Sequence, residues 1–285
     1  MKSYLSVVDK VFKYGDIKVG RNGVTRSISG AEFSHDMREG FPILTLREMN
    51  LAMAVTELRF FIQGLSDKRW LQDRGCKFWD KWCNKRSLEY IEQLSRGKRL
   101  EEAAKATNDL GPIYGVQWRG FNGIDQLQAV IDTLKTNPNS RRMLVSAWNP
   151  EEIEEMALPP CHDSFQFISN GVDLDIIWRQ RSCDVAVGLP YDILLYALLL
   201  TLVAKEVGMQ PRYLVGHLGD THVYGVNEAR LDVVRQRQTM LLPELTLEWP
   251  EGMTVNRWAM SNYDSDQWSL KNYEAHPKVF FEVVA

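Results

Sequence analysis

The spacing of apolar residues predicts several elements along the chain, and the clearest is a long apolar segment that begins near residue 190. Between residues 193 and 204 only Tyr196 and Thr201 carry a polar side-chain atom, which predicts a buried helix of about 17 residues after a break at Gly188–Pro190. Asp192 stands at the start of this run. Because an ionised carboxylate is costly to bury without a partner, the sequence raises the question of what Asp192 binds.

The remaining pattern mixes helices and strands. Helices are predicted at 2–13, 48–63 and 124–138, and strands at 141–148, 172–181 and within 211–225. Residues 20–30 predict a glycine-flanked loop that leads into a strand. Residues 84–108 are strongly charged and helix-prone, which indicates a solvated helical insertion. Since there is no regular βαβ alternation, we expect an α+β fold with one domain over residues 1–285.

Composition and charge exclude several classes of protein. The net charge is −3, so nothing indicates a general attraction to nucleic acid or to a membrane surface. Any bound anion must be held by a few placed arginines. The four cysteines have no CxxC spacing and no histidine cluster beside them, so we expect no metal site. The N-terminus does not resemble a signal peptide, and the apolar run is shorter than the ~20 residues of a membrane span. We expect a reduced, soluble, cytoplasmic protein.

The segment ALPPCHDSFQF (157–167) contains the first candidate for chemistry. Two prolines precede Cys161 and restrict the backbone, so the cysteine side chain is held in one direction next to His162. Arginines nearby in the sequence favour a thiolate nucleophile, because a cation lowers the pKa of a cysteine. The alternative is a buried structural cysteine.

Two arginine-containing segments suit a phosphate. In QRSCD (180–184), Arg181 and Ser182 combine a forked cation with a hydroxyl, although a charged surface turn is the alternative. Arg141 and Arg142 begin a predicted strand and are otherwise surface residues.

Aromatic and imidazole side chains suit a sugar and a flat ring. In GDTHVY (219–224), His222 and Tyr224 alternate onto one strand face and suit a sugar hydroxyl, with a satisfied strand histidine as the alternative. Trp79 and Trp82 are three residues apart, which suits either a core position or a stacking wall for a heterocycle. Together these segments indicate a site for a phosphorylated nucleoside.

These segments, with GLPYDILLYALL (188–199), NPNSRRMLVSAW (137–148) and DLGPIYGVQWRG (109–120), resemble signature segments of thymidylate synthase. The resemblance runs through nearly the whole chain and is weakest at 84–108. It implies an α+β fold with a bent mixed sheet packed with helices, and a homodimer formed sheet to sheet. It also implies 5,10-methylenetetrahydrofolate as co-substrate, small-molecule nucleotide substrates, no metal, and no requirement for nucleic acid or membrane.

The resemblance also implies a role for each matching residue. The expected catalytic residues are Cys161 as the nucleophile, Glu57, Tyr114, His162 and Asp220. The expected nucleotide-binding residues are Arg21, Gln180, Arg181, Ser182, Asp192, His222 and Tyr224, with Arg141 and Arg142 donated by the partner subunit. The expected folate-binding residues are Trp79, Trp82, Asp184, Gly188 and Ala285. In this chemistry the thiolate adds at C6 of a pyrimidine, so that C5 becomes nucleophilic toward the methylene of the folate.

Asp192 departs from the family pattern, because thymidylate synthases resemble this segment but carry asparagine there. An amide can donate to uracil O4 and accept from N3–H, whereas an ionised carboxylate can only accept. Cytosine offers an N4 amino donor, and deoxycytidylate hydroxymethylases look similar in having aspartate here. Asp192 therefore favours dCMP as the substrate. The alternatives are dUMP with a protonated Asp192, and a helix N-cap without a role in recognition.

The product and the enzyme class have alternatives of their own. Trp79 and Trp82 favour a dry site and therefore a methyl product, whereas the polar Asp163 and Ser164 resemble the hydroxymethylases and favour a hydroxymethyl product. A non-catalytic nucleotide- or RNA-binding relative is a further alternative, which the intact nucleophile and proton-handling positions disfavour. A cytosine-modifying enzyme would suit a virus with altered DNA bases, acting in the host cytoplasm.

Overall fold

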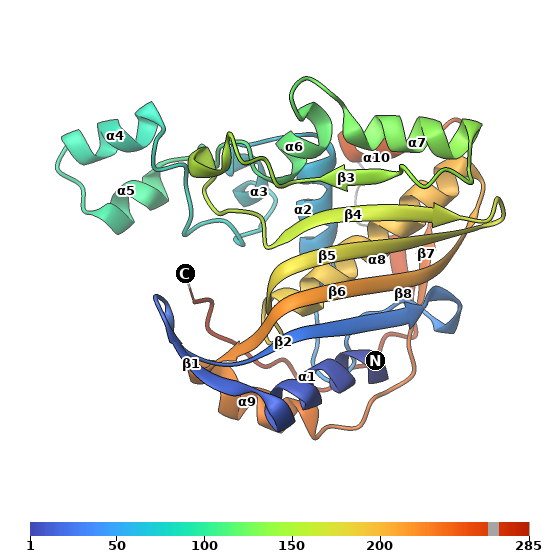
Figure 1. Cartoon of the computed structure of the whole chain (residues 1–285), viewed down its shortest axis with the longest axis horizontal. Coiled ribbons are helices and arrows are strands. Elements are labelled where there is room, and N and C mark those ends of the chain that lie inside the picture. The colour runs from blue at the N-terminus through green and yellow to red at the C-terminus, as the bar shows by residue number, and fades with distance from the viewer. Residues whose placement is uncertain (262–267, 285) are drawn as a thin grey trace.

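One six-stranded mixed sheet organises the protein (Figure 1), as seen in a computed structural model that describes residues 1–261 and 268–284. The strand order is β1-β2-β6-β5-β4-β3. The strands are β1 (Asp16–Gly20), β2 (Gly23–Asp36), β3 (Leu144–Ser146), β4 (His162–Ser169), β5 (Asp173–Asp184) and β6 (Gln210–Tyr224). Strands β5 and β6 run parallel, and the other neighbouring pairs are antiparallel. A separate two-stranded sheet pairs β7 (Glu244–Leu247) with β8 (Trp268–Lys271).

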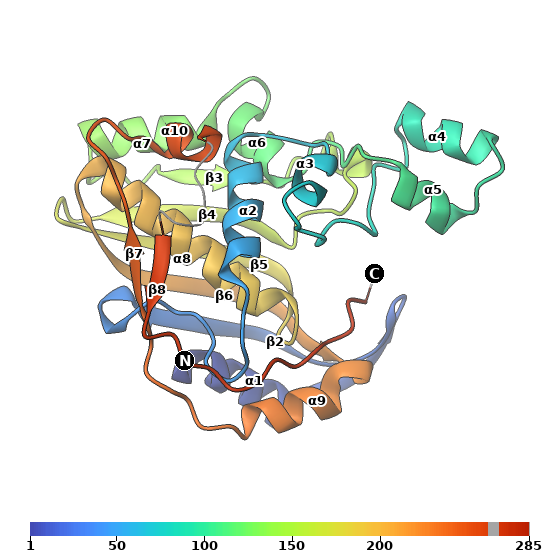
Figure 2. The ribbon, with the colours of Figure 1, turned by 180° about the vertical axis from the view of Figure 1, so that it is seen from behind.

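Helices pack against the sheet and give the α+β class that the sequence predicts. The helices are α1 (Lys2–Tyr14), α2 (Leu51–Ile62), α3 (Arg69–Gln72), α4 (Leu88–Ser95), α5 (Leu100–Ala106), α6 (Tyr114–Gly120), α7 (Gln126–Thr136), α8 (Gly188–Val207), α9 (Gly225–Arg235) and α10 (Val255–Met260), with 3₁₀ turns at Met37–Glu39 and Ile153–Glu155. Figure 2 shows α2 and α8 on one face of the sheet. In both views α4 and α5 project from one end of the molecule.

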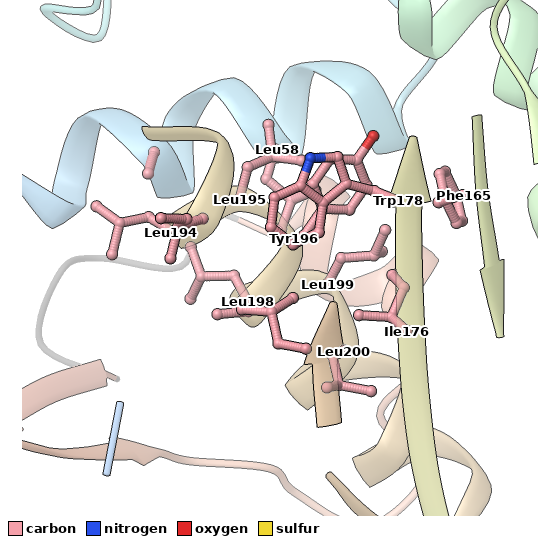
Figure 3. Close-up of a cluster of buried hydrophobic side chains, with 14 of the residues drawn as sticks. Leu58, Phe165, Ile176, Trp178, Leu194, Leu195, Tyr196, Leu198, Leu199 and Leu200 are labelled. Carbon is pink, nitrogen blue, oxygen red and sulfur yellow. The ribbon is translucent and has the colours of Figure 1, made fainter. Parts of the chain in front are cut away.

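Helix α8 forms the centre of the core and connects β5 to its parallel neighbour β6. It is 20 residues long and apolar enough to cross a membrane, but 72% of its most apolar window is buried inside the protein, as expected of a core helix. Tyr196 of α8 stacks on Trp178 of β5 with ring centroids 5.2 Å apart (Figure 3). Burial of this helix against the sheet therefore fixes the height and rotation of Asp192 near its start.

Two of the differences between the structure and the sequence prediction lie in the main sheet. Residues 20–30 are not a loop, because the chain turns tightly at Arg21 and Asn22 and β2 begins at Gly23. The prediction was wrong because the outward side chains of β2 are polar or small and interrupt the apolar pattern. Strand β4 was not predicted, since it begins one residue after the proline pair and carries polar residues at its start.

The predicted insertion at 84–108 is helical and has a small core of its own. Helices α4 and α5 pack around Cys83, Tyr90, Ala103 and Ala104, with Leu94 against them. This cluster is separate from the main core. The insertion is therefore joined to the rest of the protein by the chain segments on either side of it and by contacts outside its own small core.

Candidate active site

One end of the sheet gathers the predicted site residues from several strands. The antiparallel pairing of β4 and β5 sets His162 opposite Gln180, and the parallel pairing of β5 and β6 sets Ser182 opposite Asp220. Cys161 immediately precedes β4 at the same end. Helix α8 begins here as well, so that Asp192 faces this row from the helical layer.

Cys161 is half-buried and held by its neighbours. Its backbone N–H donates to the Tyr114 hydroxyl at 2.8 Å. Arg181 donates from Nε to the Pro160 carbonyl at 2.8 Å and from Nη2 to the Pro159 carbonyl at 2.9 Å, which anchors the cation beside the cysteine. Burial raises the pKa of Cys161, and the charge of Arg181 lowers it only in part. In the chain alone burial outweighs the charge of Arg181, so the thiolate stays a prediction for the complete site.

Glu57 of α2 and the tryptophan pair form a second group. Trp79 Nε1 donates to Glu57 Oε1 at 2.8 Å, and the Trp79 and Trp82 rings lie 6.2 Å apart. The surrounding protein raises the pKa of Glu57 to about 8, although part of its surface stays accessible and the bond from Trp79 opposes the shift. Glu57 therefore carries a proton at neutral pH and can release it at mildly basic pH. Trp79 is buried and Trp82 is half-buried, so one ring supports the site and the other reaches its surface.

His162 lies beneath the cysteine and is neutral. A 2.8 Å hydrogen bond joins its Nδ1 to the Tyr196 hydroxyl, and its ring stacks on Tyr114 with centroids 4.2 Å apart. Burial lowers the pKa of His162 to about 3, so it does not carry charge at physiological pH. Its Nε2 lies 3.7 Å from Asp192 Oδ1. The Tyr196 contact could not be predicted, because that hydroxyl lies within an apolar helical run.

Asp192 is not the N-cap of α8, so the capping alternative is wrong. The N-cap is Val187, which makes no side-chain capping bond. Asp192 Oδ2 instead accepts from Gln180 Nε2 at 2.8 Å. The Gln180 amide has a fixed orientation, because its Oε1 accepts from Trp178 Nε1 at 3.2 Å and its Nε2 also donates to the Ser182 carbonyl at 3.1 Å. Gln180 therefore presents a donor to the carboxylate.

The ionisation of Asp192 is balanced near neutrality. Burial raises the pKa of Asp192 to about 7, and the hydrogen bond from Gln180 limits the rise. Oδ1 makes no hydrogen bond to the residues that the structure describes, and the side chain keeps 15% of its surface exposed. This oxygen is consequently available to a ligand, either as an acceptor or, when protonated, as a donor.

Asp220 is held by residues that the sequence did not single out. Ser27 Oγ donates to its Oδ1 at 2.6 Å, and Lys18 Nζ donates to its Oδ2 at 3.3 Å. His222 Nδ1 lies 3.2 Å from the same Oδ1, and the His222 and Tyr224 rings meet edge to face at 5.1 Å. The predicted pairing of His222 and Tyr224 is confirmed. Ser27 and Lys18 were missed because their approach depends on strand pairing.

The other residues predicted to bind the folate are Asp184, Gly188 and Ala285. Asp184 Oδ1 accepts from the Ala186 and Val187 backbone N–H groups at 2.8 and 3.2 Å, so this oxygen holds the turn before α8. Gly188 lies beside Asp192, since a Cβ added there would make an ordinary van der Waals contact with Asp192 Oδ2 at 3.6 Å. Ala285 lies outside the described residues.

Arg21 lies at the exposed tip of the β1–β2 hairpin. Its Nε donates to Asn22 Oδ1 at 3.0 Å. Asn22 also hydrogen-bonds Tyr224, which brings the hairpin tip to the end of β6 where the site residues gather.

Arg141 and Arg142 do not join this group within the chain. They are exposed, and the Phe167 N–H donates to the Met143 carbonyl at 2.9 Å, so they lie beside the last residues of β4, away from Cys161. The extended strand between this point and Cys161 spans about 20 Å. An arginine pair at that distance does not contact a ligand of Cys161 in the same subunit.

Comparison with known proteins identifies the family. A family model described as thymidylate synthase matches residues 2–285. The chain belongs to the thymidylate synthase family. It is 37% identical over 295 aligned residues to the thymidylate synthase of Mycoplasma genitalium, and 35% identical over 296 residues to that of Mesoplasma florum, with 99% of each chain covered in both cases.

Members of the thymidylate synthase family are methyltransferases that use 5,10-methylenetetrahydrofolate as co-substrate and need no metal. Across residues 1–261 and 268–284, no group of three or more His, Cys, Asp or Glu side chains is placed to hold a metal ion. Both relatives are named thymidylate synthase, so these names support the family and not the expected deoxycytidylate-specific member.

Proposed function

We propose that this thymidylate synthase-family enzyme transfers its one-carbon unit to C5 of dCMP. The fixed orientation of the Gln180 amide supports this substrate, because Gln180 occupies Oδ2 of Asp192 as a donor and leaves Oδ1 toward a ligand. An ionised Oδ1 accepts from the N4 amino group of cytosine and repels O4 of uracil. A site built on one buried hydrogen bond discriminates between such analogues by up to ~10⁴.

The proposed chemistry uses the described groups at the end of the sheet. Cys161 adds through Sγ to C6 of the pyrimidine, which makes C5 nucleophilic. Burial raises the pKa of the Cys161 thiol, and the bound phosphate dianion cannot lower it. The positive charges of Arg181 and of the partner's arginines are therefore what stabilises the thiolate. Glu57 exchanges protons with the ring and its surroundings, and its pKa of about 8 suits that task near neutral pH. His162 stays neutral beside Asp192, with its Nε2 3.7 Å from Oδ1.

We also assign residues to the phosphate and the sugar of the nucleotide and to the folate. We assign the phosphate to Arg21, Arg181 and Ser182, and the sugar hydroxyl to His222 and Tyr224 with support from Asp220. We assign the folate to Trp79 and Trp82, whose rings present an aromatic surface, and to Asp184, Gly188 and the C-terminal Ala285. The folate supplies the one-carbon unit to C5.

Tritium release tests the proposed substrate. The enzyme is mixed with 5,10-methylenetetrahydrofolate and either [5-³H]dCMP or [5-³H]dUMP, and release of the C5 hydrogen to water is counted. We expect kcat/KM to be higher for dCMP by two or more orders of magnitude at pH 8, on the order of what a buried hydrogen-bond mismatch costs. Equal or faster release from dUMP at that pH would overturn the assignment to dCMP.

A second candidate substrate is dUMP, which two observations favour. The pKa of Asp192 is about 7, so a protonated carboxyl can donate to uracil O4 at lower pH. The relatives are also named thymidylate synthase. Comparison of the two nucleotides across pH 6 to 8.5 separates the candidates, because donation to O4 fades as Asp192 ionises.

We propose that the product carries a methyl group. The polar residues that favour a hydroxymethyl product, Asp163 and Ser164, bind each other. Ser164 Oγ donates to Asp163 Oδ1 at 3.0 Å, and Arg179 Nη1 lies 3.5 Å from the same oxygen. Buried Trp79 supports a dry site, which favours methyl transfer over capture of water. Mass spectrometry of the nucleotide product distinguishes the two groups, and dihydrofolate formation followed by absorbance accompanies only the methyl product.

We further propose a homodimer in which each subunit lends Arg141 and Arg142 to its partner's phosphate site. Both arginines are exposed and lie about 20 Å along β4 from Cys161 of their own chain, which supports a role in the site of a second copy. The dimer also supplies cations that the isolated chain lacks beside Cys161.

A further inference from the structure

Lys68 has no role in the proposed chemistry, yet its side chain is completely buried. It lies just before α3, on the stem that leads from α2 toward the tryptophan pair. Its Nζ donates to three backbone carbonyl oxygens, of Ala104 at 2.8 Å, of Trp82 at 2.9 Å and of Asp80 at 3.3 Å. An ammonium has three donors, so these carbonyls satisfy it fully. Burial lowers the pKa of Lys68, which makes the three bonds the main compensation for desolvation.

The three carbonyls belong to two different parts of the protein. Asp80 and Trp82 lie in the turn that carries both tryptophans, and Ala104 lies in α5 of the insertion. Ala104 also belongs to the small cluster that holds α4 and α5 together. One lysine nitrogen therefore connects the insertion to the turn at residues 79–82, which we call the aromatic turn.

The aromatic turn is in direct contact with Glu57. The Trp79 indole donates to Glu57 Oε1 at 2.8 Å, and the Trp82 N–H donates to the Trp79 carbonyl at 3.1 Å, so the two tryptophans share one tight turn. A shift of this turn changes the hydrogen bond to Glu57 and the surface that Trp82 presents. The position of the turn thus influences both the proton-handling carboxyl and the folate side.

We propose that Lys68 is a positioning residue that couples the 84–108 insertion to the Trp79–Glu57 contact and thereby sets folate binding and the ionisation of Glu57. Lysine suits this task because its single nitrogen reaches three acceptors that converge from different directions. The planar fork of arginine cannot match that arrangement. The inference rests on the proposed folate role of the tryptophans and is independent of the preference for dCMP or dUMP.

The test compares Lys68→Met with a matched control, Lys105→Met, which removes an exposed lysine from the same insertion. Both variants are assayed with whichever nucleotide the enzyme turns over. We expect Lys68→Met to raise KM for the folate on the order of tenfold, as a misplaced binding group does, while KM for the nucleotide changes by less than about twofold. The control should match the unmodified enzyme in both constants.

A pH profile separates positioning from simple support of the fold. Trp79→Phe removes the indole donor together with part of the buried ring, and loss of the donor raises the pKa of Glu57 because the bond from Trp79 lowers it. The part of the kcat/KM profile that reports the ionisation of Glu57, its Glu57 limb, should therefore move to higher pH in Trp79→Phe. We expect Lys68→Met to move this part of the profile in the same direction. The double variant should show no further shift, since both changes act on one contact.

A variant on the other side of the connection keeps the test decisive if Lys68→Met does not fold. Tyr90→Ala loosens the α4–α5 cluster without entering the main core. It should raise KM for the folate and shift the Glu57 limb in the same direction as Trp79→Phe. A folded Tyr90→Ala or Lys68→Met protein with a lower Tm but an unchanged folate KM and pH profile would overturn the proposal. Failure of the enzyme to use any nucleotide would instead contradict the proposed function.

Discussion

Gln180 Nε2 donates a hydrogen bond to Asp192 Oδ2 at 2.8 Å, which links strand β5 to the first turns of helix α8. The indole of Trp178 holds the far side of the same amide. The direction of the Asp192 carboxyl is consequently set by the sheet and not by the helix on which it lies. Under the proposed function, recognition of the base by Asp192 depends on the core that holds both elements together.

Asp192→Asn exchanges an acceptor for an amide that can both donate and accept. We expect kcat/KM for dCMP to fall and that for dUMP to rise, so that the ratio of the two changes by ~10² to 10⁴, in the range of buried hydrogen-bond mismatches. Tritium release from the two labelled nucleotides measures the ratio. An unchanged ratio in a folded variant would contradict base recognition by Asp192.

The base preference should depend on pH because Asp192 has a pKa of about 7. Below that pH the protonated carboxyl can donate to uracil O4, and above it the carboxylate accepts from the cytosine amine. We therefore expect the ratio of kcat/KM for dCMP over dUMP to rise as pH increases from 6 to 8.5. The same ratio in Asp192→Asn should be flat, since the amide does not titrate. A flat ratio in the unmodified enzyme would exclude Asp192 as the titrating group.

The two buried carboxyls should reduce stability at basic pH. Their pKa values, about 8 for Glu57 and about 7 for Asp192, lie above the ordinary values, so the folded state holds protons that the unfolded state releases. Stability from this source is complete below about pH 4 and is lost as pH rises through 7 to 8. We expect Glu57→Gln and Asp192→Asn to be more stable than the unmodified protein at pH 8.5 by on the order of 2 kcal/mol, with little difference near pH 4.5.

Thermal unfolding across this pH range measures the effect. The exposed Glu244 supplies a matched control, because Glu244→Gln removes a charge without a buried partner. Variants of Glu57 and Asp192 that are no more stable than this control at pH 8.5 would show that water, and not protein, surrounds the two carboxyls.

Mixed dimers test the donation of arginines between subunits. Cys161→Ser and Arg142→Glu should each be inactive as pure dimers. After the two are co-refolded, a subunit with intact Cys161 pairs with a partner that carries an intact Arg142, and partial activity should return. Restoration requires that the arginine act across the interface. Mixtures that stay inactive while forming dimers would show that Arg142 serves its own chain or has no role in binding.

Gly216 provides space for the indole that orients Gln180. A Cβ at this position would lie 2.3 Å from Trp178 Cζ2, so Gly216→Ala forces the ring to move. We expect a loss of about 1–3 kcal/mol in the free energy of unfolding, as for other overpacked cores. Gly20→Ala is the control, because its nearest contact would be the Gly23 carbonyl at 3.8 Å. Similar denaturant midpoints for the two variants would contradict the tight contact.

Much of the site could be predicted because it depends on short segments. Asp192, Arg181 and Cys161 stand in motifs whose spacing is visible in the sequence, and the long helix behind Asp192 follows from its apolar run. The charge and helix-forming residues of 84–108 predict helices, and α4 and α5 lie there; that this segment is an insertion stays a prediction.

The residues that support the site could not be predicted, because their partners are distant in the chain. Ser27 reaches Asp220 only through the pairing of β2 with β6, and Tyr196 reaches His162 only through the packing of α8 on the sheet. Lys68 carries no pattern that marks a buried lysine, since its acceptors are backbone carbonyls and leave no trace in residue types.

The pairing of β2 with β6 has a consequence for biosynthesis. Strand β2 ends at Asp36, and its partner β6 begins only at Gln210, after β5 and α8 have been made. Until this last strand of the six-stranded sheet has been synthesised, the nascent chain carries an unpaired strand edge and an exposed apolar helix, which are features that promote aggregation. Chains interrupted before this point leave both surfaces open to chaperones and proteases, so production of functional enzyme depends on translation through residue 224 without long pauses.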